Sequence, residues 1–168
     1  LQFNDGYIFI AHSPYLRAKK TAKIFYTTGK KLFKHTNFIL CNNPLLRELD
    51  YGELAGQEFT SKDLTFRPPG GESYYDVYGR MQTFFNAFGL TPDDRSVDDI
   101  NTRAYLIIVT HKFACFAAHH VLTGENLFSS NRSAGWPNAR FRYYSVYGRS
   151  FGQIAVNENK PKFKYEIE

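Results

Sequence analysis

The stretch "IVTHKFACFAAHHVLTG", residues 108–124, decides the fold. Branched apolar residues at positions 107–109 end a predicted strand that leads through a threonine into His111. An apolar, helix-like run follows and stops at Gly124. Open α/β sheets bind their ligands at the carboxyl ends of the strands, which is where His111 stands. The stretch therefore predicts an α/β domain with His111 at a ligand site.

The chain on either side of this stretch continues the same pattern. Upstream, a short apolar strand is expected from Tyr7 to Ala11, and Ser13-Pro14 matches an N-cap followed by a proline in the first helical turn. That helix is predicted to end at Gly29. "NFILCNNP" (37–44) is a second strand candidate. The unbroken apolar run "AYLIIVT" (104–110) fits a parallel strand that is covered on both faces.

The remaining segments complete an alternating order of strands and helices. Residues 45–73 look like a long loop, after which Ser73 caps a helix "YYDVYGRMQTFFNAFGL" (74–90). An acidic connector (91–103) precedes the strongest strand, and two edge strands paired as a hairpin are expected at 140–148 and 151–157. This order predicts a three-layer α/β/α architecture with a mostly parallel central sheet.

Composition limits the classes of protein and partner. The 168 residues fit one globular domain, 1–168, and the formal charge of +5 gives a mild preference for anions. No basic run is dense enough to favour nucleic acid. Cys41 and Cys115 lack a CxxC spacing, so neither a zinc site nor a redox pair is indicated, and no cofactor is expected. No apolar run is long enough to span a bilayer. The compartment stays open between the cytoplasm and an organelle such as the mitochondrion.

Three residues are candidates for chemistry, each with a plainer alternative. Arg17 falls in the first turn of a helix, where the backbone amides favour an anion and a guanidinium can grip phosphate; it can equally be a surface arginine. Glu48 lies on a glycine-rich loop that could bring a carboxylic acid to a leaving group, or it can pair with Arg47. His111 can hold the same anion or pack as an ordinary histidine.

Four segments occur in an order that resembles the histidine phosphatase superfamily, also called phosphoglycerate mutase-like. They are "SPYLRAKKTA" (13–22), "LLRELDYGELAG" (45–56), "PGGESYYDVYGRM" (69–81) and "IIVTHKF" (107–113). Patterns such as SPxxRAxxTA, a glutamate before Tyr/Phe-Gly, PxGES followed by DVxxR, and a late Ser/Thr-His-Gly mark that family. The segment "RPPGGESYYDVYGRM" (67–81) is similar to a eukaryotic branch of it. The resemblance covers residues 7–148.

The resemblance implies a phosphohistidine mechanism. In such a mechanism a histidine attacks a phosphomonoester, a carboxylic acid protonates the leaving oxygen, and water hydrolyses the phosphohistidine. By position, Arg17 is implied to clamp the phosphoryl group, Glu48 to donate the proton, and His111 to serve as the second histidine. The resemblance implies no metal.

The chain departs from the family pattern at two places. The family begins with a strand ending in Arg-His-Gly, followed by a helix, and this chain starts at the second strand, so the nucleophile is unknown. His12 is a weak substitute because Ala11 stands where arginine is expected and Ser13 where glycine is expected. Lys112 replaces the glycine after the second histidine, where it could crowd the pocket or add a cation.

These departures leave several interpretations of structure and function. The domain is expected to be N-terminally incomplete: a fragment of a longer protein, a sheet completed by a partner's strand, or a remodelled fold. The leading hypothesis is a non-catalytic domain, a pseudoenzyme, that binds phosphate or a phosphomonoester or serves as a structural subunit of an assembly. The alternative is an active phosphatase or mutase whose Arg-His-Gly segment lies upstream of Leu1.

Overall fold

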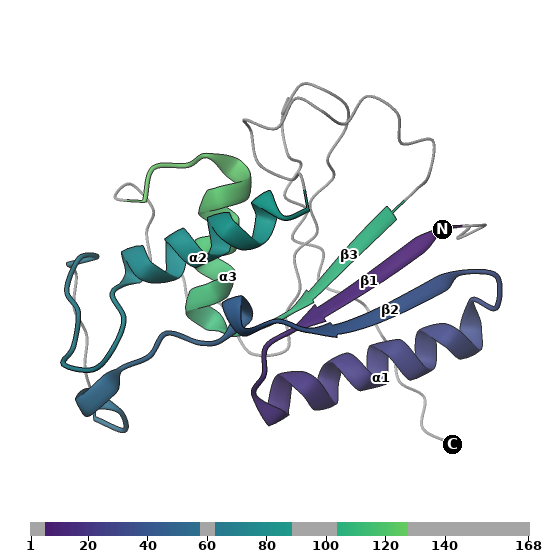
Figure 1. Ribbon diagram of the computed structural model, residues 1–168, viewed down its shortest axis with the longest axis horizontal. Coiled ribbons are helices and arrows are strands. Elements are labelled where there is room, and N and C mark those ends of the chain that lie inside the picture. Colours follow the sequence, from purple (N-terminus) through teal and green to yellow (C-terminus); the bar gives the residue numbers. More distant parts are fainter. Residues whose placement is uncertain (1–5, 58–62, 89–103, 128–168) are drawn as a thin grey trace, which may run out of the picture.

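A three-stranded parallel sheet forms the centre of the computed structural model (Figure 1). The strands are β1 (Tyr7–His12), β2 (Asn37–Asn42) and β3 (Ala104–Val109), in the spatial order β2-β1-β3. All three strands were expected from the sequence. The structure describes residues 6–57, 63–88 and 104–127.

The strand register brings the carboxyl ends of all three strands to one level. His12 at the end of β1 lies opposite Asn42 of β2 and Val109 of β3. The Ser13 amide continues the ladder by donating to the Val109 carbonyl at 3.0 Å. The segments that leave the strands, and the polar side chains on them, therefore start at a common edge.

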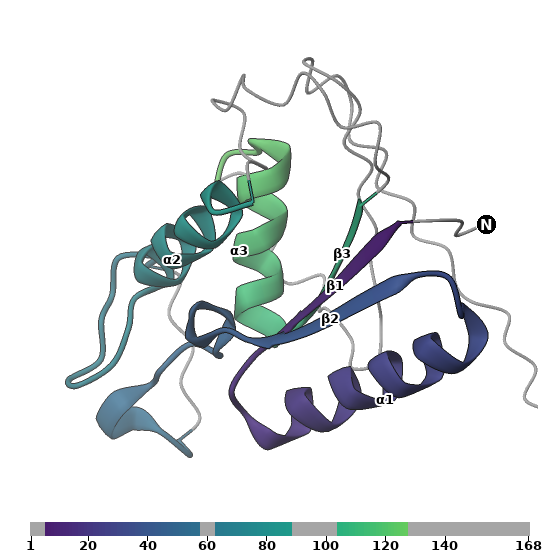
Figure 2. The ribbon, with the colours of Figure 1, turned by 45° about the vertical axis from the view of Figure 1, so that its right-hand side comes forward.

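Helices cover both faces of the sheet, as Figure 2 shows. They are α1 (Leu16–Leu32), α2 (Tyr74–Asn86) and α3 (Lys112–Thr123). Helix α1 packs on one face, and α2 and α3 pack together on the other. The α/β class and the layered arrangement predicted from the sequence are confirmed.

Strand alternation divides the core into two halves. On one side, Ile8 and Ile10 of β1 pack with Ala22 of α1. On the other, Ala11 joins a larger cluster from α2 and α3 that is fully buried at Phe84 and nearly so at Phe85. Because apolar residues face both ways along the strands, the sheet is buried on both faces, as parallel sheets require.

The predicted limits of α1 were wrong at both ends. The helix begins at Leu16 with Tyr15 as its N-cap, because the Ser13 hydroxyl contacts His111 and its contact with a backbone amide is to Tyr15, at 3.3 Å, and not to an amide inside the helix. Gly29 does not end the helix, which continues to Leu32. A Cβ at Gly29 would lie 2.4 Å from the Phe38 ring, so this glycine allows α1 to approach β2 closely.

The Ser73 cap of α2 and the Gly124 cap of α3 follow the sequence, but α2 ends at Asn86, before the predicted limit at position 90. The Ser73 hydroxyl accepts from the Asp76 amide at 3.2 Å and the Asp76 carboxylate accepts from the Ser73 amide at 2.7 Å, which makes a capping box. The Ser73 hydroxyl also donates to Asp76 and lowers the pKa of that carboxyl. Gly124 ends α3 with φ of 68°. The acidic connector and the hairpin expected at 140–148 and 151–157 lie outside the described residues.

Candidate functional site

Arg17 and His111, the two predicted phosphate ligands, are in direct contact. The Arg17 Nε–H donates to Nδ1 of His111 at 3.1 Å, across 94 positions of sequence. Arg17 is the second residue of α1, and His111 is the N-cap of α3. The parallel register produces this meeting, because both helices start just beyond the carboxyl ends of adjacent strands.

Ser13 fixes the other side of the His111 ring. Its Oγ lies 2.7 Å from Nε2 of His111. An arginine N–H can only donate, so Nδ1 of His111 accepts and Nε2 carries the proton, which it donates to Ser13. The Tyr15 ring lies 5.1 Å from the His111 ring, between centroids, and 5.2 Å from the Arg17 guanidinium carbon. Sequence analysis did not assign Ser13 or Tyr15 to the site.

The electrostatic setting keeps His111 neutral near pH 7. Burial, followed by the positive charges of Arg17 and Arg80, lowers the pKa of His111 to about 4. His111 is 7% exposed. Two cations close enough to act on one imidazole produce a positive potential, which an anion would offset.

The Glu48 carboxylate lies at the start of α3, where it contacts the backbone of Phe113, two residues after His111. Its Oε1 accepts from the Phe113 amide at 3.1 Å and from its neighbour Leu49's amide at 3.0 Å. A carboxylate at a helix N-terminus is stabilised by the helix dipole. The plainer alternative, an ion pair with Arg47, does not form, because Arg47 pairs with Glu72.

A buried network that sequence analysis left without a role holds the Glu48 segment. The Arg80 side chain is 7% exposed and donates to the carbonyls of Leu45 at 2.5 Å and Glu48 at 3.2 Å. Its Nε also donates to Glu72 at 3.2 Å, and the other Glu72 oxygen accepts from the Asp50 amide at 3.3 Å. Glu72 lies in the PxGES motif and Arg80 in the DVxxR motif, but the motifs do not show that the two side chains contact each other.

His12 and Lys112 lie near the site without joining it. His12 is 4% exposed, and its Nδ1 lies 2.7 Å from the Ser13 carbonyl. Among the hydrogen bonds of the described residues, none links His12 to Arg17, Glu48 or His111. The Lys112 ammonium lies 5.6 Å from the centroid of the Phe113 ring.

An open hollow adjoins Arg17 and faces solvent. Tyr15, Leu16, Arg17 and Lys20 line it. Two of these four side chains are cationic and one is aromatic. Within residues 6–57, 63–88 and 104–127, no three His, Cys, Asp or Glu side chains gather closely enough to hold a metal ion.

Comparison with known families fits this geometry. A sequence model of the histidine phosphatase superfamily (branch 1) matches residues 4–159. The chain belongs to the histidine phosphatase superfamily. Membership accounts for the order of motifs that brings Arg17, Glu48 and His111 to one edge. The closer similarity of 67–81 to a eukaryotic branch stays a prediction.

Solved structures share the fold of this histidine phosphatase domain. The native structure of mycobacterial glucosyl-3-phosphoglycerate phosphatase is 22% identical, with a TM-score of 0.61, and the match covers 90% of this chain and 75% of that one. Its complex with inorganic phosphate and a structure titled mycobacterial hydrolase 1 are each 20% identical, with TM-scores of 0.51. These two matches cover 71% of this chain and 60% of the neighbour. No curated protein matches the sequence.

Proposed function

We propose that this histidine phosphatase domain binds phosphate, free or as a phosphomonoester, between Arg17 and His111. The observation that carries the proposal is the 3.1 Å contact between these side chains at the carboxyl edge of the sheet. The first turns of α1 and α3 flank the contact, and their backbone amides favour an anion. The mycobacterial neighbour solved with inorganic phosphate supports the same ligand class.

Each site residue would make a different contact with a bound phosphoryl group. The Arg17 guanidinium can donate two parallel hydrogen bonds to phosphate oxygens. The Nε2–H of His111, which donates to the Ser13 hydroxyl, would turn to a phosphate oxygen when the anion enters. Glu48, which is held at the start of α3 by the Phe113 amide, is the carboxyl group that would protonate a leaving oxygen.

The 168-residue chain is proposed to bind a phosphomonoester without hydrolysing it. A phosphohistidine mechanism needs a second imidazole facing the phosphorus, and in the described part of the chain buried His12 makes no hydrogen bond to Arg17 or His111. Enzymes accelerate phosphomonoester hydrolysis by up to about 10²¹-fold, which a clamp and an acid without a nucleophile do not approach. We therefore expect p-nitrophenyl phosphate to be bound and not hydrolysed.

An active phosphatase or mutase is the second candidate. The placement of Glu48 at the start of α3, the helix that His111 caps, favours it, because a proton donor has a use only where a leaving group departs. In this candidate a chain longer than the present one carries Arg-His-Gly ahead of Leu1. Release of p-nitrophenol by the 168-residue chain, at a rate that falls in Glu48→Gln, would contradict the non-catalytic form and leave phosphate binding intact.

Phosphate binding should appear as a thermal shift that depends on Arg17. We expect inorganic phosphate at 100 times its dissociation constant to stabilise the wild-type chain by about 2.7 kcal/mol, which raises the unfolding temperature by several degrees. Arg17→Ala should lose most of this shift, because a charge-assisted bidentate contact disappears. Arg67→Ala is the matched control, since the Arg67 side chain is 62% exposed and pairs with Asp76 of α2. Equal shifts in all three proteins would show that Arg17 does not hold the anion.

A further inference from the structure

Helix α1 carries positive charge only. Its 17 residues include six lysines and arginines and no acidic residue, and from position 6 to position 47 the chain has no Asp or Glu at all. No ion pair among the described residues involves a side chain of α1. The layer of α1 is therefore a cationic surface whose charge is not balanced from within the described part of the fold.

The same helix exposes its large apolar residues and buries its small ones. Its buried positions are Ala18, Ala22 and Gly29. Its exposed side chains include Leu16 at 64%, Ile24 at 66%, Phe25 at 51% and Leu32 at 68%. A surface helix normally turns its large apolar side chains to the core. The inverted pattern indicates that the outward surface of α1 is covered by something apolar.

We propose that the outer face of α1 docks on an anionic lipid surface. This face is defined by Leu16, Lys20, Ile24 and Lys31, which share one side of the helix at 3.6 residues per turn, and the exposed Phe25 and Leu32 lie on the flank of α1. A helix of this length extends about 24 Å and can lie in the plane of the headgroups. The leucine and isoleucine side chains of this face enter the acyl boundary, while lysine ammonium groups stay at the level of anionic headgroups.

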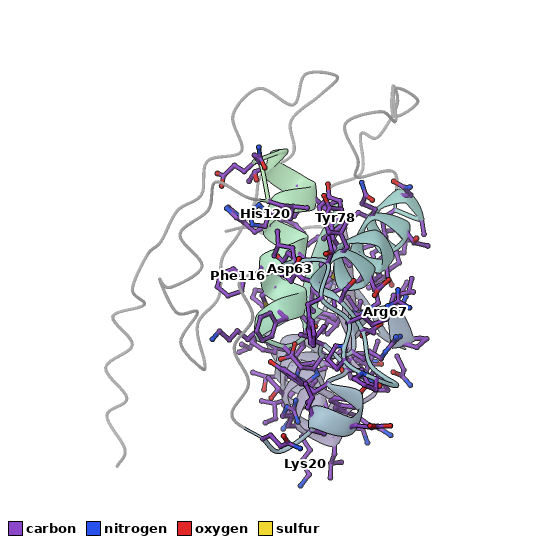
Figure 3. The ribbon with its side chains drawn as sticks, turned by 90° about the vertical axis from the view of Figure 1, so that its left-hand side faces the viewer. Lys20, Asp63, Arg67, Tyr78, Phe116 and His120 are labelled. Atoms are coloured by element: carbon purple, nitrogen blue, oxygen red, sulfur yellow. The ribbon has the colours of Figure 1, made fainter. Side chains whose placement is uncertain are left out.

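The predominance of lysine over arginine on α1 favours a lipid partner over an acidic protein. Five of the six cations of α1 are lysines and one is arginine. Lysine is depleted in protein–protein interfaces, where arginine is enriched, whereas lysine flanking apolar residues is typical of interfacial helices. Figure 3 shows Lys20 at one extreme of the molecule, opposite His120 of the α2–α3 layer. Docking through α1 would thus place the α2–α3 layer on the side away from the lipid.

The contact is peripheral and does not rest on the proposed phosphate site. In the described ranges, no helix has the length and apolarity needed to cross a bilayer. Lys31 and Leu32 lie at the end of α1 away from Arg17, and Ile24 lies at the middle of the helix, seven residues from Arg17. Variants at these positions therefore test membrane docking separately from phosphate binding.

Vesicle cosedimentation of the 168-residue chain tests the proposal. We expect the wild type to sediment with vesicles of phosphatidylcholine containing about 30% phosphatidylserine, and not with pure phosphatidylcholine. Lys31→Glu should weaken the partition coefficient by about tenfold, since each lysine near such a surface contributes roughly fivefold and the new charge is repelled. Ile24→Ser should weaken it by about fivefold or more through lost apolar burial.

Two substitutions outside α1 serve as matched controls. Lys112→Glu and Phe66→Ser, a cation and an exposed aromatic outside α1, should change the partition coefficient by less than about twofold. Unchanged thermal unfolding midpoints would show that Lys31→Glu and Ile24→Ser fold. Failure to sediment with phosphatidylserine vesicles would overturn the proposal, and so would binding that ignores Ile24→Ser. Retention on polyglutamate without vesicle binding would overturn it in favour of an acidic protein partner.

Discussion

Replacing Arg80 with methionine should destabilise the domain by about 3–5 kcal/mol, the range seen when one partner of a buried ion pair is removed. The substitution keeps the volume and removes the charge. Glu72, 13% exposed, would lose one of its two arginines, and the carbonyls of Leu45 and Glu48 would each lose a donor. The urea midpoint of unfolding measures the loss. The expected loss is a large part of the free energy of unfolding, about 5–15 kcal/mol, that is typical of a domain.

An exposed arginine provides the comparison. Arg67 also pairs with an acidic side chain, Asp76 at 2.5 Å, and its side chain is 62% exposed. Arg67→Met should therefore cost no more than about 1 kcal/mol. Glu72→Gln combined with Arg80→Met should be markedly less than additive, since both changes break the same contact. Equal losses from Arg80→Met and Arg67→Met would show that Arg80 does not brace the Glu48 segment.

Gly52→Ala should destabilise the domain by about 3 kcal/mol. Gly52 has φ of 51°, and a Cβ there would lie 2.1 Å from the Pro69 carbonyl oxygen and 2.6 Å from the Gly71 amide. These are backbone atoms that no rotamer change can move. The loop that carries Glu48 and the turn that carries Glu72 would have to separate, so the loss should appear in the urea midpoint.

Substitution of Gly56 is a control that distinguishes the steric clash at Gly52 from the strain of a positive φ. It also has a positive φ, 82°, but a Cβ there meets nothing within 4 Å. Gly56→Ala should cost only the strain of the left-handed conformation, about 1 kcal/mol. If both alanine variants lose the same stability, the close approach of the two loops contributes nothing.

The sequence predicted the order and type of the elements because their signals are local. The apolar runs at 7–11, 37–41 and 104–109 can only be strands of a buried parallel sheet once helices alternate with them. The caps at Ser73 and Gly124 are confirmed because their partners lie within a few residues. The extent of a single domain over 1–168 stays a prediction.

Errors arose where a residue serves a distant partner. Ser13 was assigned to a helix cap, but its hydroxyl contacts His111, 98 positions away. Gly29 was assigned to a helix end, but its missing side chain admits the Phe38 ring. In both cases a tertiary contact outcompetes the local pattern.

The sequence predicted which residues form the candidate site better than it predicted which side chains contact them. Arg17, Glu48 and His111 were found by their motif positions, and the structure brings them to one edge. The roles predicted for them in catalysis and phosphate binding remain proposals. The Arg80–Glu72 pair was missed because the two residues lie in a helix and in the loop before it, no local signal pairs them, and only the fold joins them.

The measurement that tests phosphate binding most directly is a ring-proton NMR titration of His111 with and without inorganic phosphate. Without phosphate, His111 should titrate near pH 4. An anion held against the ring favours the protonated form, so saturating phosphate should raise this pKa by about one unit or more in the wild type. The same ionic strength of chloride should not, nor should phosphate added to Arg17→Ala. A His111 pKa that does not respond to phosphate would contradict a site between Arg17 and His111.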